Sequence, residues 1–454
     1  MKHKTSLLLL SVSTIVITIC ACQKEIKTAN KSSELQTATR NAHGHLKQTK
    51  TYTSDVAISW MNMQLRLMRT ATGIPNVAFV RPYAYSSIAL YETVVSGMPA
   101  YQSLEGQLSG LSGLPQTNPG FAYHWPGAAN AALAYINKNM FPTTSDANKT
   151  AIDSLENALN IQYQGEADAA TINRSIDFGK AVAQKVFDWA QTDGYLHASD
   201  PYSPPVGPGF WVPPTIPLPV SSTPYWGNLR NFVNGSDDNA QPGVPTTYSE
   251  DPTSDFYKMA KQVYDVSQTL SAEQTAMALY LRDVPGVTTP GHYVSILKQV
   301  LENDKPMLDE AAIAYALGGI VCYDAAISCW KTKYQYNLVR PVTYIRNVLG
   351  YTLWSPLLGT PAHPEYSSAH AVLSASVADV LTNVFGENYN WTDHTYDYLG
   401  MAPRSFSSFR DFGIDAGNSR LYAGIHYQFS IDLGLVQGRK VAQNIISKLK
   451  VLKD

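Results

Sequence analysis

Hydrophobic residues recur three and four positions apart along most of the chain, which is the spacing of one face of an α-helix. Segment 54–71 is typical, because Ser54 precedes its apolar positions as a candidate N-cap. Alternating strand patterns are scarce, so we expect an all-α fold built from helical bundles. The predicted helices are 54–71, 84–97, 126–141, 145–163, 170–194, 253–283, 292–302, 307–331, about 366–386, about 406–424 and about 430–449.

Two parts of the chain lack this periodicity. Residues 195–250 are dense in proline and tryptophan, so we expect an ordered segment packed over the helices. Residues 23–50 are polar and rich in Lys, Thr, Ser, Gln and Asn, which is typical of a flexible tether. The helices that follow residue 50, together with the segment 195–250, are expected to form a single domain over 51–454.

The first 22 residues combine a basic start, an apolar run from Ser6 to Ile19 and small residues before a cysteine. The run is too short for a confident membrane span and predicts an export signal. Its end, "ICAC", resembles a bacterial lipobox, so we predict a lipoprotein signal peptide over 1–22 with Cys22 as the lipidated residue. Membrane contact would then be only through the lipid, at the outer membrane or cell surface. An ordinary signal peptide cleaved near Ala21, which would leave a periplasmic protein, is the alternative.

Composition narrows the class of protein. The chain has 454 residues, of which 44% are hydrophobic, and this is enough for a large core. A formal net charge of −2 argues against a surface that binds nucleic acid. Cys322 and Cys329 lie on one predicted helix, roughly 10 Å apart by helix rise, which is too far for a mutual disulfide. We expect both in the core.

Candidate chemistry lies in three segments of the last third of the chain. The first is "KTKYQYNLVRPVTYIR", residues 331–346. Lys333 and Arg340 are seven positions apart and would share one face of a continuing helix, which Pro341 would end. Taken alone, two cations near a helix C-terminus are expected to be solvated residues that suit the helix dipole.

The second segment is "TPAHPEYSSAHAVLSASVADVL", residues 360–381, where polar residues precede a long apolar helix. Ser367 or Ser368 can cap a helix that begins near His370. The unpaired backbone N–H groups at such a helix start form a natural anion site. A plain serine cap and a histidine without a function are the alternative.

The third segment is "GNSRLYAGIHYQFSIDLG", residues 417–434. Arg420 lies late in an apolar helix, Gly424 is expected to loosen the end of that helix, and His426 follows in the turn. In isolation, this arrangement is also consistent with an arginine over the last turn and a histidine without a function.

Taken together and in this order, the three segments resemble the signature of the vanadium-dependent haloperoxidases, which share a fold with the type 2 phosphatidic acid phosphatases. Residues 324–346, 360–371 and 207–227 are similar to bacterial members, and the resemblance covers about 54–450. It implies that the helical bundles surround a vanadate- or phosphate-binding core and that 51–454 is one catalytic domain. The implied cofactor is vanadate, the implied substrates are hydrogen peroxide and halide, and the implied state is a monomer or homodimer.

The resemblance also implies a role for each residue of the site. His426 would be the metal ligand to vanadium, His370 the acid–base group on the opposite side, and Lys333 the group that polarises the peroxide. The oxyanion would be bound by Lys333, Arg340, Ser368, Ala369, Arg420 and His426.

The chain departs from the family pattern at two positions. Ala369 stands where the family usually has glycine, so the pocket would be distorted if a positive φ were needed there. Ser430 stands where an acidic residue is common, four positions after His426. Either Asp432 or a distant carbonyl is then expected to orient the His426 ring. If the absence of that acidic residue weakens the site, a Ser430→Asp change should leave activity unchanged or raise it.

Four further residues are candidates for the wall of the pocket: His363, which could tune halide choice, Trp330, Tyr334 and Tyr293. Iodide is the easiest halide to oxidise and is the expected substrate, with bromide as a second candidate. Two other functions stay open. One is a secreted acid phosphatase that forms a phosphohistidine at His426, and the other is a degenerate anion-binding lipoprotein.

Overall fold

The all-α prediction is confirmed by a computed structural model that describes residues 47–214 and 222–453. The α-helices are α2 (Asp55–Thr70), α3 (Val80–Val94), α4 (Trp125–Met140), α5 (Asp146–Tyr163), α6 (Ala169–Ala190), α7 (Asp255–Gln268), α8 (Ala272–Tyr280), α9 (Thr289–Asp304), α10 (Leu308–Tyr336), α11 (Pro341–Asn347), α12 (Ala369–Phe385), α13 (Phe409–Tyr422) and α14 (Gln428–Lys448). Short 3-10 turns are η1 (Thr49–Thr51), η2 (Asn76–Phe79), η3 (Val95–Gly97), η4 (Tyr195–His197), η5 (Trp226–Asn228) and η6 (Asp397–Leu399). Within the described residues, the strands are β1 (Trp391–Asp393) and β2 (Arg404–Phe406), paired antiparallel.

Several boundaries differ from the prediction, and local capping explains three of them. The helix predicted over 253–283 is two helices, since the Ser271 side chain caps α8 in a capping box with Gln274. Helix α10 runs on to Tyr336 and ends where Asn337 takes a left-handed conformation, with φ 47°. Pro341 therefore does not stop the helix of Lys333. It begins α11, which the sequence did not predict.

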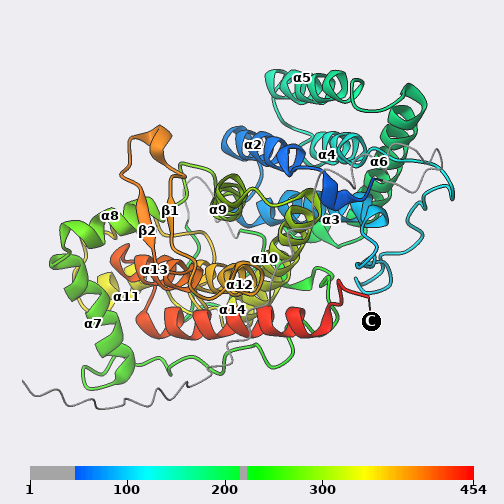
Figure 1. The fold of residues 1–454 in the computed structure, drawn as a ribbon. Helices are drawn as coiled ribbons and strands as arrows, with labels where there is room; N and C mark the ends of the chain where they lie inside the picture. Colours follow the sequence, from blue (N-terminus) through cyan, green and yellow to red (C-terminus); the bar gives the residue numbers. More distant parts are fainter. Residues whose placement is uncertain (1–46, 215–221, 454) are drawn as a thin grey trace, which may run out of the picture. The chain divides into compact units, whose positions relative to one another are not determined.

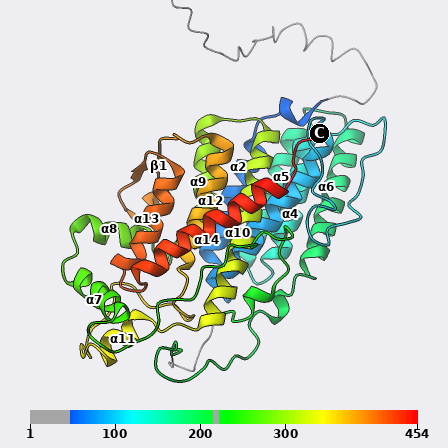
Figure 2. The same ribbon diagram turned by 90° about the horizontal axis from the view of Figure 1, so that it is seen from below.

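Helix α10 is the centre of the fold and joins two groups of helices (Figure 1). On one side it packs against α3, which belongs to a bundle with α4 and α6. On the other side it packs against α12 and α14, and α13 covers α12 (Figure 2). By length and hydropathy α10 could cross a membrane, but 94% of its apolar window is buried inside the protein. Its composition is therefore that of a core helix.

Close helix contacts fix the position of α12, whose N-terminus begins the candidate site. A Cβ atom added at Gly438 of α14 would lie 2.1 Å from the backbone oxygen of Val372. Only glycine allows α14 to approach α12 so closely. Gly319 plays the same part between α10 and α3, where an added Cβ would lie 2.8 Å from the Cα of Ala84.

The Pro- and Trp-rich segment is ordered where the structure describes it, as predicted. Trp211 and Trp226 are almost fully buried, and the buried Asp324 carboxylate of α10 accepts hydrogen bonds from the backbone N–H groups of Phe232 and Val233 at 2.7 and 3.0 Å. These contacts hold the segment against the helical core. Cys322 and Cys329 are buried free thiols, as expected.

The predicted signal peptide and Cys22 lie outside the described residues, as does most of the predicted tether. The prediction of a tether over 23–50 is wrong for residues 47–50, which pack on the helical domain. The Thr49 hydroxyl donates to the Val94 carbonyl at 2.8 Å, and Trp125 Nε1 donates to the Lys47 carbonyl at 2.7 Å. The domain therefore begins a few residues before the predicted boundary.

Candidate functional site

A cavity of about 230 Å³ lies at the N-terminus of α12. The predicted residues that line it come from α10 (Trp330), from the segment before α12 (His363), from the first turn of α12 (Ala369, His370), from α13 (Arg420) and from the turn after it (His426). The fold therefore brings parts of the second and third sequence segments to one place, and Arg340 of the first segment contacts two of the lining residues, His363 and His426. Their roles stay predictions, which the geometry below makes specific.

Arg340 lies beneath this cavity and is 1% exposed, so the solvated alternative is wrong. It is the N-cap residue of α11 in extended conformation, not a residue on the face of α10. Its guanidinium donates to the Ile425 carbonyl at 2.9 Å, to the His363 carbonyl at 2.9 Å and to His426 Nε2 at 3.1 Å. Burial lowers the pKa of Arg340 to about 10, so the side chain remains a cation at neutral pH.

Lys333 is fully buried below the segment that precedes α12. Its ammonium donates to the backbone carbonyls of Pro364, Glu365 and Ser367, which uses all three of its N–H bonds. Lys333 does not line the cavity. It therefore supports the segment by hydrogen bonds and acts on the cavity by its charge, while a direct contact with an oxyanion or a peroxide stays a prediction.

Arg420 reaches the cavity from the last turn of α13 and is 3% exposed. It donates to the Leu281 carbonyl at 2.9 Å and to the Ser419 hydroxyl at 3.1 Å. Within the described residues, no carboxylate oxygen lies within the 4.0 Å ion-pair distance of Arg420, Lys333 or Arg340. Buried cations without close counter-ions are costly unless an anion joins them.

The His426 ring is held by a residue that the sequence analysis missed. Its Nδ1 donates to Glu365 Oε1 at 2.7 Å, and the same oxygen accepts the Tyr427 N–H at 3.1 Å. Nε2 is then the unprotonated nitrogen and accepts from Arg340. Burial, reinforced by the nearby Arg340 and Lys333, holds the pKa of His426 well below its usual range. The ring is therefore neutral, and its Nε2 lone pair can bind a metal or a phosphorus centre when the hydrogen bond from Arg340 gives way.

The expectation for the group that orients His426 was therefore wrong. Asp432 accepts instead from the Gln428 side chain on the protein surface. Ser430 lies in the first turn of α14 and is buried, so it does not cap that helix, which begins after Tyr427. Glu365 is fully buried, and burial raises the pKa of its carboxyl to about 7, although Arg340 and Lys333 oppose the rise.

Helix α12 begins at Ala369 with Ser368 as the N-cap residue, yet the Ser368 side chain makes no capping hydrogen bond. Its hydroxyl is buried without a hydrogen-bond partner in the described structure. Ser367 is not the cap either, because its hydroxyl donates to Gln437 Oε1 at 2.6 Å. Ala369 is a regular helical residue and is absent from the non-glycine residues with positive φ. Replacement of glycine by alanine therefore does not distort the backbone.

His370 lines the cavity from the first turn of α12, and its Nε2 donates to Asp283 Oδ2 at 3.1 Å. The Thr289 hydroxyl lies 3.4 Å from the same nitrogen. Burial, with Arg420 adding to it, lowers the pKa of His370 to about 4 against the opposing effect of Asp283. His370 is therefore neutral at physiological pH, and Nδ1 is its basic nitrogen.

Three further predicted pocket residues differ in position. His363 lines the cavity, and its Nδ1 accepts from Arg340 at 3.0 Å, with the Trp330 ring 5.1 Å away between centroids. Tyr334 and Tyr293 do not line the cavity. Tyr334 donates to the Ser222 carbonyl, and Tyr293 pairs with Ser374 inside the core.

The two carboxylates that hold the histidines, Glu365 and Asp283, were missed because nothing local marks them. Glu365 lies inside the quoted segment 360–381, five residues before His370, so proximity in the chain was an available signal. Asp283 follows α8, far from each of the three segments, and only the fold brings it to His370.

The donor set fits a multiply charged oxyanion. Helix N–H groups, an unpartnered Ser368 hydroxyl and the buried arginines can bind its oxygens, and one neutral histidine nitrogen can bind its central atom. Among the described residues, no group of three or more His, Cys, Asp or Glu side chains is placed to hold a bare metal ion. The donors that are present therefore suit an anion that brings its own oxygens.

Comparisons with known proteins agree with this chemistry. A family model described as the VCPO second helical-bundle domain matches residues 314–453. Vanadium chloroperoxidase of Curvularia inaequalis is 24% identical over 233 residues, which are 43% of this chain and only 38% of that relative. The crystal structure of the first bacterial vanadium-dependent iodoperoxidase matches with a TM-score of 0.81 and 31% identity, over 88% of this chain and 98% of that one. A holo-type bacterial vanadium-dependent chloroperoxidase shares the fold, with a TM-score of 0.65 and 16% identity over 84% of this chain and 94% of that one.

Proposed function

Because the chain belongs to the vanadium-dependent haloperoxidase family, we propose that it binds vanadate and oxidises a halide with hydrogen peroxide to hypohalous acid. One observation carries the proposal. The buried cations Arg340 and Arg420, with Lys333 nearby, have no close carboxylate and lie around a histidine whose Nε2 is unprotonated. Burial lowers the pKa of Lys333 to about 7, so an anion that enters the site would also favour its charged form. Such a site gains stability when a multiply charged oxyanion enters it, because the anion supplies the missing counter-charge.

His426 Nε2 is the atom that would bind vanadium, since Glu365 holds the proton on Nδ1. Arg340 and Arg420 would bind oxygens of the anion, and Lys333 would add charge from below. The Ser368 hydroxyl and the Ala369 N–H are free to donate at the start of α12. When bound, vanadate(V) is a Lewis acid that activates hydrogen peroxide without changing its own oxidation state.

His370 supplies the acid–base function in this proposal. Its Nδ1 is basic and the residue lines the cavity, so it can accept a proton from hydrogen peroxide. The Asp283 carboxylate on Nε2 orients the ring and stabilises the imidazolium that forms. Release of the proton returns His370 to the neutral form for the next turnover.

Iodide is the proposed substrate, with bromide as the second candidate. Iodide requires the weakest oxidant of the halides, and the structural relative at 31% identity is an iodoperoxidase. His363 supports a specific halide preference, because it lines the cavity beside Trp330 and is fixed by Arg340. Burial, together with Lys333 and Arg340, holds the pKa of His363 well below its usual range, so the ring presents no charge of its own.

The test uses purified protein that lacks residues 1–22. It is incubated with and without orthovanadate, freed of excess vanadate, and assayed for triiodide formation from iodide and hydrogen peroxide. We expect activity only after vanadate loading, and we expect inorganic phosphate to compete with the loading. Hydrolysis of p-nitrophenyl phosphate without vanadate, and no iodide oxidation with it, would overturn the proposal in favour of a phosphatase.

We also propose that the protein is an exported lipoprotein anchored through Cys22. The support is the sequence of residues 1–22, which lie outside the described part of the structure. Incorporation of a labelled fatty acid into the full chain, and its loss in Cys22→Ser, is the expected result. An unlabelled, fully processed wild-type protein would contradict it.

A further inference from the structure

A buried chain of four ionisable side chains leads away from the candidate site. It begins at His370, whose Nε2 lies 3.1 Å from Asp283 Oδ2. The other oxygen of Asp283 accepts from His292 Nδ1 at 2.8 Å, and His292 Nε2 donates to Asp393 Oδ2 at 2.6 Å. These residues come from α12, the turn after α8, the first turn of α9 and β1, and His292, Asp283 and Asp393 are each at most 2% exposed.

The hydrogen bonds determine the charge of His292. Ionised carboxylates only accept hydrogen bonds, so an imidazole between two of them donates from both nitrogens and carries a positive charge. Burial lowers the pKa of His292, but the Asp393 and Asp283 carboxylates outweigh burial and raise the pKa to about 10. His292 is therefore a cation throughout the neutral range, although the proposed function does not use it directly.

We propose that His292 is a positioning residue for the reaction, because its fixed positive charge offsets much of the negative charge of the Asp283 carboxylate that contacts His370. A carboxylate next to a histidine favours the imidazolium form, which cannot accept a proton. Asp283 shared with a cation can orient the His370 ring and still leave it neutral. The inference rests on the proposed function, in which His370 must accept a proton.

The backbone conformation of the turn between α8 and α9 also supports a specific role for these residues. Asp283 has φ 62° and Thr288 has φ 68°, which are uncommon values for residues other than glycine. Strained residues of this kind persist where the surrounding structure determines them, and they are frequent at functional sites. Here the two residues bracket the turn that presents Asp283 to both histidines and starts α9 just before His292.

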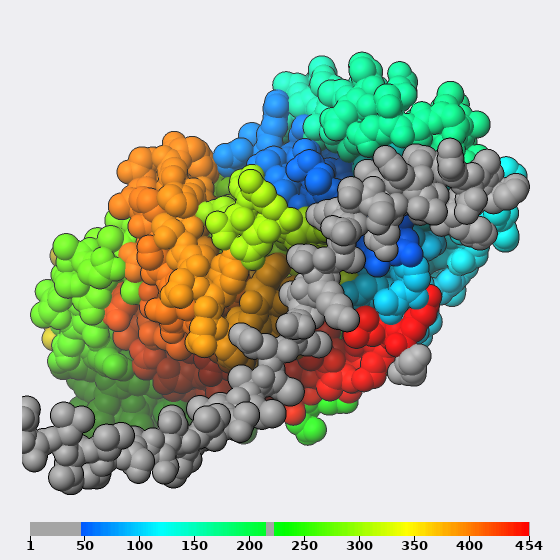
Figure 3. Space-filling view, in the orientation of Figure 1, coloured from blue at the N-terminus to red at the C-terminus, as the bar shows by residue number. Residues whose placement is uncertain are grey.

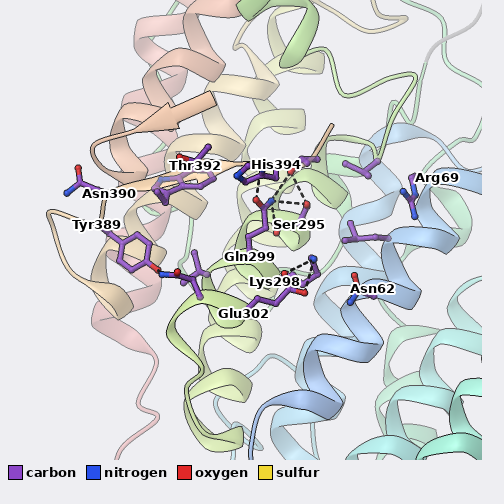
Figure 4. Close-up of a pocket in the computed structure, with 16 residues that line it drawn as sticks. Asn62, Arg69, Ser295, Lys298, Gln299, Glu302, Tyr389, Asn390, Thr392 and His394 are labelled. Atoms are coloured by element: carbon purple, nitrogen blue, oxygen red, sulfur yellow. Dashed lines mark hydrogen bonds and ion pairs between the residues drawn. The ribbon is translucent and has the colours of Figure 1, made fainter. Parts of the chain in front are cut away.

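The row of ionisable side chains ends at Asp393, beside a second cavity of about 720 Å³ that lies between α2, α9 and β1. Asp393 Oδ1 accepts from the Thr395 hydroxyl at 2.6 Å, from the Thr395 N–H at 2.9 Å and from Gln299 Nε2 at 3.2 Å. Thr395 and Gln299 line that cavity, where Gln299 and Ser295 lie together (Figure 4). Helix α9 and the segment around β1 are neighbours on this face of the protein (Figure 3).

His292 and Thr395 keep the Asp393 carboxylate ionised. The charge and hydrogen bond of His292, with the two hydrogen bonds from Thr395, outweigh burial and hold the pKa of Asp393 below its usual range. In the described structure, further titratable or charged groups that face these four side chains are Tyr280 on α8, Tyr293 on α9, Tyr396 beside η6 and Arg420 on α13. Tyr396 donates to Asp283 Oδ1 at 2.9 Å, so it also stabilises the ionised form of Asp283.

The first experiment measures proton positions in the vanadate-free protein by NMR of histidine labelled with ¹⁵N in the ring. At pH 8 we expect both nitrogens of His292 to carry protons, and His370 to be neutral with its proton on Nε2. In Asp393→Asn we expect the pKa of His292 to fall below 8, so that the ring carries a single proton at pH 8. A singly protonated His292 in the wild-type protein at pH 8 would overturn the inference, whether or not the protein proves to be a haloperoxidase.

The second experiment compares the pH dependence of vanadate-dependent iodide oxidation. We expect the acid limb to move to higher pH by about one unit in His292→Gln, since Asp283 then acts on His370 alone. It should move the other way in Asp283→Asn. His394→Gln, at an exposed neighbour paired with Asp397, is the matched control and should leave the limb in place.

An unshifted acid limb in His292→Gln would overturn the inference, because a merely structural residue would lower activity at every pH alike. His292→Asn, which also removes the charge, repeats this test if His292→Gln fails to fold, with the same upward shift expected. Absence of vanadate-dependent oxidation in the wild-type protein would instead contradict the proposed function, and the NMR result would still decide the charge of His292.

Discussion

His426 Nδ1 lies 2.7 Å from Glu365 Oε1, although 61 positions separate the two residues in the chain. This bond decides which nitrogen of His426 is free, and so which atom can bind a cofactor. It also explains why the chain can have Ser430 after His426, because the acidic partner comes from the segment before α12 instead.

Glu365→Gln should weaken oxyanion binding by about 10- to 100-fold, the usual effect of losing the partner of a metal-binding histidine. The amide keeps a similar shape but can present its N–H₂ group to His426, which would favour the wrong tautomer. The measurement is calorimetric titration of the vanadate-free protein with orthovanadate or phosphate.

Asp432→Asn is the matched control, since Asp432 is the acidic residue closest to His426 in sequence but contacts Gln428 on the surface. We expect its affinity for the oxyanion to equal that of the wild type. Weaker binding in Asp432→Asn and normal binding in Glu365→Gln would show that the structure assigns the wrong partner.

The two histidines of the cavity should separate binding from turnover. His426→Ala should abolish vanadate binding, because it removes the proposed metal ligand. His370→Ala should weaken binding only in part and lower iodide oxidation by about 10²- to 10⁴-fold, the usual contribution of a general acid–base group. Equilibrium dialysis with vanadate and steady-state assays measure the two effects. Retained peroxidase activity in both variants would contradict the assignment.

Ala369→Gly should leave oxyanion affinity unchanged, because Ala369 already has regular helical backbone angles at the start of α12. The variant should be less stable by about 1 kcal/mol or less, since glycine loses more conformational entropy on folding. Thermal unfolding and phosphate titration are the measurements. A clear gain of affinity would show that alanine does restrict the site.

Ser430→Asp should destabilise the protein and lower activity, which reverses the expectation from the sequence. Ser430 is fully buried, and its hydroxyl lies near the buried Glu365 carboxylate, whose pKa burial already raises to about 7. A second carboxyl there would add like charge without a new cation. Thermal unfolding and vanadate titration of the variant test this, with Ser430→Ala as the control of similar size. Improved activity in Ser430→Asp would favour the earlier expectation.

The stability of the vanadate-free protein should depend on pH through His292. Its pKa is raised to about 10 in the folded protein, so its contribution is complete below the unfolded value near 6.5 and is lost as the pH rises toward 10. The melting temperature of the wild type should therefore fall more steeply between pH 7 and 10 than that of His292→Gln. Parallel curves for the two proteins would contradict this.

The sequence by itself determined the helical class and most helices, because amphipathic periodicity and caps such as Ser145 and Ser254 are local. It also indicated the residues of the proposed oxyanion site, because His370, Arg420 and His426 lie in short segments whose order resembles that of a known family. It failed where a local break overrode the periodicity, as between α7 and α8, and in the short α11.

Only the tertiary structure decided which partners these residues have. Asp283, His292 and Asp393 lie on different elements, and no spacing along the chain relates them to His370. Their charges and tautomers follow from burial and hydrogen bonding, which exist only once α8, α9, β1 and α12 pack together. The sequence could indicate the groups that contact an anion, but the packed core sets the charge and orientation with which they do so.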